Sequence, residues 1–501
     1  MLAWTIYLSF LGAAAMTLLP VGNRCAARRL ALFVTLSTLT AGLLGTWQYQ
    51  TGHPAGGLAD VVNVPWVNEL GIRFHLAADG VSVVLVLLTG IAGLAGVLFS
   101  WNIEKRTKEF FALYLALIGG VYGVFLSFDL FLLFVFYEIA IVPKYFLIAI
   151  WGSTRREYGA MKLALYSFVG SAMVLVGLIA AYVVSPAHSF DLVKLANSSF
   201  PVAFQNWAFL LVFVGFAILA GLWPFHTWAP TGHVAAPTAA SMLLAGVVMK
   251  LGAYGALRVA MTLFPDGLRH WQNAIALLAV IGIVYGATVA LVQRDIKFVI
   301  GYSSVSHMGF VLLGLMTLSQ IGLSGAVLQM FSHGIIAGLL FAVVGRMVYD
   351  RTHTRDLDQL QPMNLRLLAP FAAVTFIIAG AASMGLPGFS GFVAELQVLA
   401  GAWSAFPRLT LLAGIGILVG VAFMVRVWIK AFFAETDLSS GASPAHPVAR
   451  MEPITVPERA GALLLLATTV VIGLWPGLLL NLINPTLQSP LFHAIWKGGT
   501  P

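Results

Sequence analysis

Apolar stretches of roughly 18 to 25 residues recur almost from one end to the other of this 501-residue chain. An α-helix of that length spans the hydrocarbon core of a lipid bilayer. Lipid offers no hydrogen bonds to an exposed backbone, so helices are favoured because they pair their own N–H and C=O groups. The sequence therefore predicts a single all-α, polytopic membrane domain over residues 1–501.

The composition supports a membrane protein and excludes several kinds of site. Hydrophobic residues make up 60% of the chain and charged residues 9%, whereas soluble domains have about 45–50% and about 25%. The net charge of +8 lies largely in short loops between apolar stretches, which is typical of topology signals and argues against nucleic-acid binding. A single cysteine, Cys25, excludes an internal disulfide and a cysteine-held iron–sulfur cluster or zinc site.

About fourteen transmembrane helices are expected. Their predicted ranges are 2–20, 28–47, 79–100, 109–127, 129–151, 161–184, 207–225, 238–262, 273–292, 298–317, 320–349, 370–401, 408–432 and 460–480. The longer segments 48–78 and 435–459 are rich in Pro, Gly and polar residues and are expected to be surface connections. With both termini outside, 18 of the 27 Lys and Arg residues fall in cytoplasmic loops and 5 on the opposite face, so the positive-inside rule predicts non-cytoplasmic termini.

Two of these spans contain a helix-breaking sequence. The seventh contains Trp223-Pro224-Phe225-His226, and the twelfth contains Gly385-Leu386-Pro387-Gly388. Proline removes a backbone donor and clashes with the preceding turn, so both helices should break within the membrane. Paired broken helices five spans apart indicate inverted repeats around a transport site. The predicted repeats are helices 4–8 (residues 109–262) and helices 9–13 (residues 273–432).

Four charged residues lie within the predicted spans at depths where a charge is costly. They are Glu138, Lys144, Lys250 and Glu395. An ionised group at the bilayer centre costs about 2.5–3.5 kcal/mol on insertion scales, so each of the four requires a partner or a function. Structural ion pairs, or a Lys144 that extends to the interface, are the alternative interpretation. Glu138 and Lys144 are too far out of phase to pair on one ideal helical face, although Pro143 between them can bend the helix.

Four histidines lie near these charges along the chain: His226, His233, His307 and His333. A single buried histidine is usually a satisfied core residue, but a set of four favours a proton relay because imidazole titrates near neutral pH. Metal binding is the competing interpretation. No HxxxH or HxxE spacing connects the four residues, so we expect no metal site.

Several motifs in order carry a resemblance to a known family. They are Trp228-Ala229-Pro230 with His233, Lys250-Leu251-Gly252-Ala253-Tyr254-Gly255, Arg294-Asp295-Ile296-Lys297, Tyr302-Ser303-Ser304-Val305-Ser306-His307-Met308-Gly309 and His353-Thr354-Arg355-Asp356. On these residues the chain resembles the M-type subunits (subunit 4 in mitochondrial naming) of respiratory complex I, NADH–quinone oxidoreductase. These are antiporter-like proton-channel subunits. The resemblance covers nearly the whole chain.

The resemblance implies a role for each candidate site residue. It implies a row of proton-transfer residues along the membrane plane: Glu138, Lys144, Lys250, His307, His333 and Glu395. Glu395 favours the M type, because the L-type, N-type and Mrp-type relatives usually have lysine there. One position departs from the family: the lysine expected seven residues before His226 is Leu219 here, and Lys144 stands where the family usually has an apolar residue. We expect that Lys144 takes the place of the missing lysine.

The implied function is proton translocation by a non-redox subunit of NADH–quinone oxidoreductase in a bacterial plasma membrane. NADH, FMN, iron–sulfur clusters and quinone are then expected in partner subunits, with no cofactor in this chain. The expected partners are the L-type and N-type membrane neighbours and lipid. Two alternatives are an Mrp-type cation/proton antiporter subunit and the paralogous subunit of a membrane-bound hydrogenase or CO2-hydrating complex.

Overall fold

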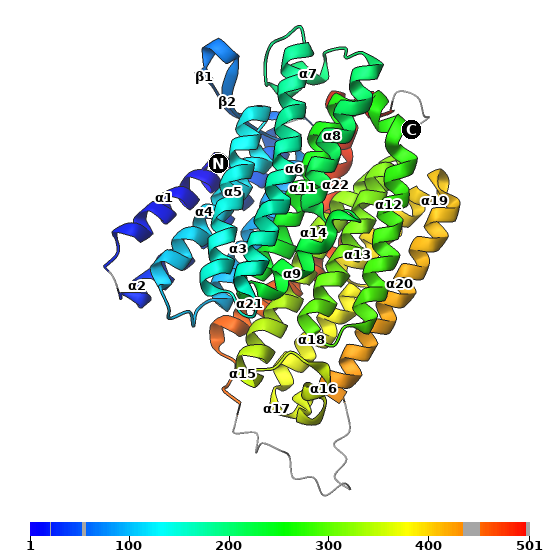
Figure 1. Cartoon of the computed structure of the whole chain (residues 1–501). Helices are drawn as coiled ribbons and strands as arrows, with labels where there is room; N and C mark the ends of the chain where they lie inside the picture. Colours follow the sequence, from blue (N-terminus) through cyan, green and yellow to red (C-terminus); the bar gives the residue numbers. More distant parts are fainter. Residues whose placement is uncertain (21, 53–56, 434–450, 497–501) are drawn as a thin grey trace, which may run out of the picture.

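The computed structural model describes residues 1–20, 22–52, 57–433 and 451–496 and shows a bundle of long helices with one small β-hairpin (Figure 1). Twelve helical segments in this described part are long and apolar enough to cross a membrane. They are α2 (Arg24–Gly52), α3 (Gly80–Phe99), α4 (Thr107–Leu126), α5 (Leu130–Trp151), α6 (Arg156–Val184), α8 to α9 (Val202–Ala235), α10 to η4 (Thr238–Met261), α12 (Pro265–Val292), α13 (Ile296–Met316), α14 to α15 (Gln320–Thr352), α20 to η7 (Pro407–Phe433) and α21 (Val456–Leu474).

Shorter apolar helices lie at the other two predicted spans. One is α1 (Ala3–Leu18), and the other is the broken pair α18 (Pro370–Ser383) and α19 (Ser390–Ala405). The all-α membrane fold is thus confirmed, whereas the division into repeats over 109–262 and 273–432 stays a prediction. The predicted connection 435–459 lies mostly outside the described residues. Short helices cap the bundle: α7 (Leu192–Ala196), α16 (Leu357–Leu360), α17 (Leu365–Leu368) and α23 (His493–Trp496).

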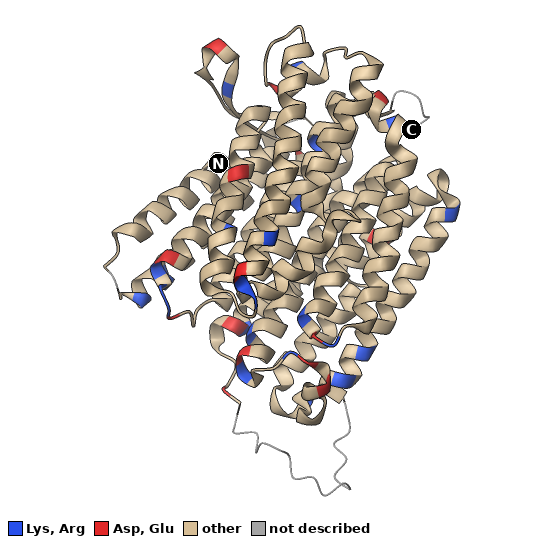
Figure 2. Ribbon diagram, in the orientation of Figure 1, with Lys and Arg blue, Asp and Glu red and all other residues tan. Residues whose placement is uncertain are grey.

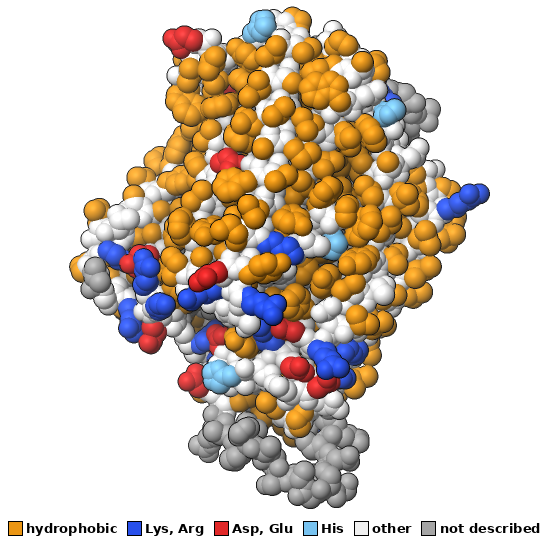
Figure 3. Space-filling view, in the orientation of Figure 1, with side chains coloured by type: hydrophobic (Ala, Val, Ile, Leu, Met, Phe, Trp, Pro, Cys, Tyr) orange, Lys and Arg blue, Asp and Glu red, His pale blue; other side chains and the backbone are white. Residues whose placement is uncertain are grey.

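The two ends of the bundle differ in charge. Lys, Arg, Asp and Glu gather at the end that carries α15 (Asp350–Thr352), α16 and α17, called the basic face below (Figure 2). The opposite end carries the β-hairpin and α7 and is called the hairpin face. Between the two ends the visible surface is mostly hydrophobic (Figure 3). This apolar belt is what a chain surrounded by lipid requires.

The hairpin is a feature that the sequence did not predict. Within the expected connection 48–78, helix α2 continues to Gly52, and strands β1 (Ala59–Val67) and β2 (Ile72–Ala78) pair antiparallel. Strand β1 is rich in β-branched valine, and Gly71 supplies the left-handed turn (φ 64°) before β2. A short two-stranded ribbon is difficult to predict from the sequence when polar residues surround its strands.

His75 fastens the hairpin to the bundle. Its Nδ1 lies 2.9 Å from a carboxylate oxygen of Asp191, just before α7, and its Nε2 lies 2.9 Å from Asp60 of β1. Burial lowers the pKa of the His75 imidazole, but the hydrogen bonds to Asp191 and Asp60 raise it more, so that its pKa lies above its ordinary value. The His75 carbonyl also accepts a hydrogen bond from the N–H of Phe128 at the start of α5.

Both predicted helix breaks are present. Helix α8 (Val202–Ala220) ends at Gly221 (φ 86°), and the chain resumes through η2 (Phe225–Thr227) into α9 (Trp228–Ala235). Helix α18 ends at Ser383, and Gly385 and Gly388 adopt positive φ before α19 begins. Glycine reaches this region without strain, which lets the chain stop one helix and start another inside the bundle.

A third break was not predicted. Helix α21 stops before Trp475-Pro476 and continues as α22 (Gly477–Leu487), so the last crossing extends beyond the expected range 460–480. This break packs against the break between α18 and α19: a Cβ placed on Gly473 would lie 2.3 Å from the carbonyl oxygen of Gly388. Only glycine at position 473 allows the two backbones to touch in this way.

The eighth span is buried from Ala239 to Met261 and is not a uniform α-helix. It runs as α10 (Thr238–Leu243), the π-helical turn η3 (Leu244–Val248), α11 (Met249–Gly255) and a second π-helical turn η4 (Ala256–Met261). Its 18-residue core window is 100% buried, as is that of the span α14 to α15. Single π-helical turns occur frequently at functional sites.

Candidate functional site

Lys250 is brought to the middle of the bundle by glycine packing. Gly246, one turn earlier, lies against Gly334 of α14 (Gln320–Ala342): a Cβ on Gly334 would lie 2.5 Å from the Gly246 carbonyl oxygen. The backbones of the two helices can approach closely only because both residues lack side chains. Lys250 and His333, which neighbour these glycines on their helices, therefore meet. The side chain of Lys250 is fully buried.

The Lys250 ammonium has two contacts. It donates a hydrogen bond to the backbone carbonyl of Ala245, and it lies 2.7 Å from Nδ1 of His333. An ammonium has donors only, so His333 Nδ1 accepts when Lys250 is protonated. The Nε2 atom of His333 has no hydrogen-bond partner among the described residues. One ring nitrogen of His333 thus contacts Lys250, and the other is available for a second partner.

His307 of α13 continues the row from His333. The ring centroids of the two histidines are 5.4 Å apart, with their planes inclined by 34°. His307 Nδ1 lies 2.9 Å from Glu395 Oε1, and its Nε2 lies 3.2 Å from the hydroxyl of Ser383. Both nitrogens of His307 therefore face groups that exchange protons. Ser383 is the last residue of α18, so the helix break places its hydroxyl at this point.

Glu395 ends the row on α19. Its Oε1 also accepts a hydrogen bond of 3.0 Å from the side-chain amide of Gln329 on α14. A Cβ on Gly325 would lie 3.0 Å from the Ala394 carbonyl oxygen, so a glycine again allows the close approach of two helices. The Glu395 side chain is 7% exposed, and its negative charge is met by the neighbouring amide and imidazole.

A small cavity adjoins the end of this row. It measures about 20 Å³ and is lined by residues that include His307, Ser383 and Glu395, with Gly416 and Gly420 of α20 (Pro407–Trp428) on its far side. A site of roughly 10–15 Å³ suffices for one water molecule when polar partners surround it. The cavity is therefore large enough for one water beside the His307–Glu395 pair.

Four of the six predicted site residues thus form one connected group across four helices: Lys250, His333, His307 and Glu395. The sequence did not identify Ser383 and Gln329 as members. Gln329 had a signal, because an amide within the apolar run Val327-Leu328-Gln329-Met330 requires a partner. Ser383 had none, because its position depends on where α18 ends.

The other two predicted residues, Glu138 and Lys144, lie on α5 apart from this group. The Lys144 side chain is fully buried, and its ammonium has no hydrogen-bond partner among the described residues. Glu138 is half-buried, with Oε1 unpartnered, and Ser171 of α6 and Lys144 are the polar groups that act on its carboxylate. Because Lys144 has no exposed surface, it does not extend to a membrane interface. Leu219, where the family has a lysine, is also buried.

A second buried charge pair, between the eighth span and α3, was missed. Arg258 is fully buried, and its guanidinium contacts both carboxylate oxygens of Asp79 at 2.5–2.6 Å. The ring of Tyr254 lies 5.2 Å from the guanidinium carbon, and its hydroxyl accepts a hydrogen bond of 3.2 Å from Arg258 Nε. Asp79 also caps α3 by accepting the Ser82 N–H. The pair carries no net charge, and its contacts anchor the first residues of α3 to the bundle.

Comparisons with known proteins agree on one family. The model described as "NADH:quinone oxidoreductase/Mrp antiporter, TM" matches residues 127–420. "NADH-quinone oxidoreductase subunit M" of Rhodobacter capsulatus is 34% identical over 97% of this chain and 96% of its own length. "NAD(P)H-quinone oxidoreductase chain 4 1" of Synechococcus elongatus is 36% identical over 97% of this chain and 90% of its own length.

Solved structures show the same fold. A chain of respiratory complex I from Thermus thermophilus with bound NADH superposes with a TM-score of 0.88 at 26% identity, covering 100% of both chains. A chain of the Mrp complex from a Dietzia species gives a TM-score of 0.84 at 21% identity, covering 99% of this chain and 98% of the other. At that identity the likeness to the Mrp chain concerns the fold alone.

Proposed function

Since this chain belongs to the NADH:quinone oxidoreductase/Mrp antiporter family of membrane subunits, we propose that it is the M-type, proton-translocating subunit of a respiratory NADH–quinone oxidoreductase. The observation that carries the proposal is the connected row from Lys250 through His333 and His307 to Glu395. Groups that bind and release protons, lying in a row inside a transmembrane bundle, can form a path for protons.

The row moves a proton by exchange between neighbours. The Lys250 ammonium donates to His333 Nδ1, and the imidazole then releases a proton from Nε2 toward His307. The 5.4 Å between the ring centroids is bridged by one water molecule or by a turn of either ring. His307 passes its proton from Nδ1 to Glu395 Oε1, 2.9 Å away. Because the groups interact strongly, they titrate as a set, and a change of charge at one end alters proton binding at the other.

Glu138 and Lys144 supply the charge change at the other end of the subunit. A buried lysine without a hydrogen-bond partner is held by the electrostatic attraction of a carboxylate, and Glu138 is the one that acts on it. Both residues lie on α5, so a bend of this helix at Pro143 that separates them leaves Lys144 uncompensated and alters the electrostatic potential along the row. Lys144 then supplies the positive charge beside Glu138. The resemblance implies a lysine for this role at position 219, where this chain has leucine.

This chain performs no redox step in the proposal. NADH, FMN, iron–sulfur clusters and quinone act in partner subunits, and L-type and N-type subunits and lipid border this one in a bacterial plasma membrane. The basic face is then cytoplasmic and both termini are on the other side. An Mrp-type antiporter is the second candidate, because the two folds superpose with a TM-score of 0.84. Co-purification decides between them: flavin and iron–sulfur subunits support complex I, and Mrp subunits support the antiporter.

The test of the function is Lys250→Ala in the intact complex. We expect the complex to assemble but to lose most proton pumping and coupled quinone reduction, because the substitution removes the ammonium that lies 2.7 Å from His333 Nδ1. Leu251→Ala, at the adjacent and equally buried position, controls for the loss of side-chain volume. Pumping is measured in membrane vesicles by quenching of a pH-sensitive dye. Wild-type pumping in an assembled Lys250→Ala complex would overturn the proposal.

A further inference from the structure

A groove of about 480 Å³ lies on the apolar surface of the bundle, in the half nearer the hairpin face. Helix α8 forms its floor from Ala203 to Val214, and Met173 of α6 and Trp271 of α12 border it. Pockets of this size with mostly apolar and aromatic walls are typical of ligand sites. None of the residues that line the groove belongs to the row between Lys250 and Glu395, so the proposed function leaves the groove without a role.

Glycine packing sets α8 back between its two neighbours. A Cβ on Gly170 of α6 would lie 2.5 Å from the carbonyl oxygen of Gly215 on α8. A Cβ on Gly267 of α12 would lie 2.3 Å from the carbonyl oxygen of Gln205 on α8. Such close approaches of two helices require glycine. The side chains of α6 and α12 therefore stand on either side of α8, and the surface of α8 between them is recessed.

Two tryptophans mark the mouth of the groove. Trp207 and Trp271 lie within the first two turns of α8 and α12, and α8 begins at the hairpin face (Figure 1). Tryptophan is enriched where the hydrocarbon of a membrane meets water. From Ala203 to Val214 the floor measures about 16 Å, which is roughly half of the hydrocarbon core of a bilayer. The groove thus has the depth of one acyl chain of the leaflet at the hairpin face.

One polar atom at the mouth has no partner. Oδ1 of Asn206 is buried and has no hydrogen-bond partner among the described residues. The backbone carbonyl of Asn206 accepts a hydrogen bond of 2.8 Å from Nε1 of Trp271, so the residue lies beside this indole. An amide oxygen only accepts hydrogen bonds, and buried polar atoms in proteins are nearly always paired. The missing partner is therefore a hydrogen-bond donor in the groove.

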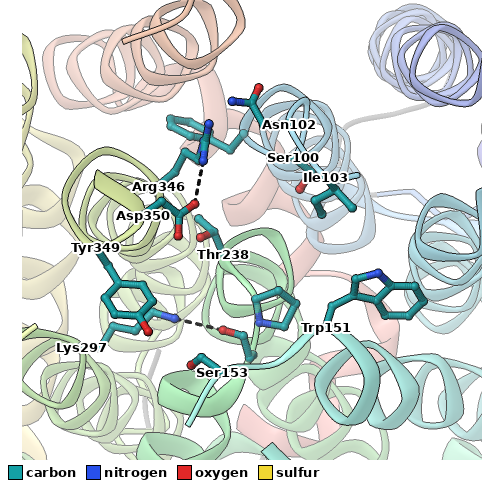
Figure 4. A pocket seen from close by; sticks show the side chains of 13 residues that line it. Ser100, Asn102, Ile103, Trp151, Ser153, Thr238, Lys297, Arg346, Tyr349 and Asp350 are labelled. Atoms are coloured by element: carbon teal, nitrogen blue, oxygen red, sulfur yellow. Dashed lines mark hydrogen bonds and ion pairs between the residues drawn. The ribbon is translucent and has the colours of Figure 1, made fainter. Parts of the chain in front are cut away.

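The groove carries no charge, in contrast to the cavity at the basic face. That cavity, of about 300 Å³, is lined by residues that include Lys297, Arg346 and Asp350 (Figure 4). Each of the described residues that line the groove is uncharged. At the start of α12, Asp266 and Arg269 lie 3.2 Å apart and oppose each other's charge. A headgroup with a net negative charge would find no counter-charge in the groove, so a headgroup that is neutral overall is favoured.

We propose that the groove binds phosphatidylethanolamine from the leaflet at the hairpin face, with one acyl chain along α8. Phosphatidylethanolamine and phosphatidylcholine are both neutral overall, but only the ethanolamine ammonium has N–H groups to donate. This ammonium donates a hydrogen bond to Asn206 Oδ1 and lies against the indoles of Trp207 and Trp271, whose faces attract cations. The acyl chain fills the recess between α6 and α12. Binding requires only the folded chain in a membrane and does not depend on the proposed function.

Photolabelling of the intact complex in proteoliposomes tests the site. The probe is a phosphatidylethanolamine with a diazirine in one acyl chain, and labelled peptides are identified by mass spectrometry. We expect label on α8 between Ala203 and Val214 and on α6 near Met173. Unlabelled phosphatidylethanolamine should compete about tenfold better than phosphatidylcholine or phosphatidylglycerol, since one lacks the donor and the other carries an uncompensated charge.

Two positions in the groove separate the acyl chain from the headgroup. Val214→Trp fills the inner end of the groove and should lower the label by about tenfold or more. Val176→Trp is the matched control, because Val176 of α6 is 55% exposed and does not line the groove. Asn206→Leu removes the acceptor at similar size, so the ethanolamine and choline lipids should then compete equally. Asn206→Asp keeps an acceptor oxygen and should keep the preference.

Three results would overturn the proposal. The first is equal competition by phosphatidylcholine or phosphatidylglycerol in the parental complex. The second is a label on α8 that Val214→Trp leaves unchanged. The third is the absence of label on α8 in the intact complex, because a partner subunit would then cover the groove. If Val214→Trp prevents assembly, the competition measured with Asn206→Leu and Asn206→Asp decides: a preference that survives in the leucine variant overturns the site.

Discussion

Moving the positive charge of Lys144 to position 219, where the family usually has its lysine, is the most demanding test of the site. Lys144→Met should leave the Glu138 carboxylate without its counter-charge. Removing one partner of a buried charge pair costs about 3–5 kcal/mol, and the lower value applies here because Glu138 is half-buried and has no hydrogen bond to Lys144 among the described residues. About 3 kcal/mol corresponds to roughly a 100-fold change in an equilibrium constant. A change of this size is enough to keep the Glu138 carboxyl group protonated or to prevent the helices around it from packing as they do here.

The structure indicates that a lysine at position 219 can replace Lys144. Phe216, one turn before Leu219, packs its ring 5.7 Å from that of Tyr137, the residue before Glu138. Residues 216 and 219 share a helical face, so an ammonium at 219 should reach the carboxylate of Glu138. We therefore expect that Lys144→Met alone abolishes most pumping and that Lys144→Met with Leu219→Lys restores part of it.

The assay is NADH-driven proton pumping in membrane vesicles, normalised to the amount of assembled complex. Lys144→Met with Leu219→Met is the matched control, since it changes the size and shape at both positions without restoring a charge. Recovery with lysine and not with methionine would support relocation of the charge. Normal pumping by Lys144→Met alone would refute the reasoning, because Lys144 would then be a bystander of the proton path.

Three further outcomes follow from the geometry. Glu395→Gln should lower pumping far more than Glu395→Asp, because only the aspartate keeps a carboxylate beside His307; equal pumping in the two variants would make the group structural. Gly334→Ala should reduce assembly or pumping, because its Cβ would meet the Gly246 carbonyl oxygen at 2.5 Å and separate the helices that carry Lys250 and His333; unchanged pumping would contradict this. The docking of the β-hairpin should weaken at high pH: the folded-state pKa of His75 is raised, so its contribution is fully present below the unfolded-state pKa and is lost as pH rises through the folded-state pKa. Hydrogen exchange of residues 59–78 measures this loss, and His75→Gln should abolish its pH dependence.

The sequence predicts what single residues dictate. Pro224 and Pro387 break their helices wherever they stand in a membrane span, because proline lacks the backbone donor. Lys250 and Glu395 are conspicuous because any charge in an apolar helix must be accounted for. By contrast, Arg258 was overlooked because it lies near the end of its span, where an interfacial arginine is unremarkable.

What the sequence does not predict is which helices touch, and at what height. The contact between Lys250 and His333 depends on glycines at 246 and 334 meeting across two helices, and glycine is too common in this chain, at 50 residues, to signal a particular contact. The position of Ser383 beside His307 depends likewise on the residue at which α18 stops. Such details come from packing between distant segments, which no local pattern records.

The two π-helical turns around Met249–Gly255 have a mechanical consequence. A π-helical turn holds one residue more than an α-helical turn, and η3 and η4 place such a surplus on each side of this seven-residue segment. Passing a surplus residue from one side of the segment to the other turns the segment about its axis by about 100°, the angle per residue of an α-helix. Gly252 opposes such a turn here, because a Cβ at this position would lie 2.4 Å from the Phe216 carbonyl oxygen of α8. The two surplus residues and this contact together fix the direction in which Lys250 faces His333.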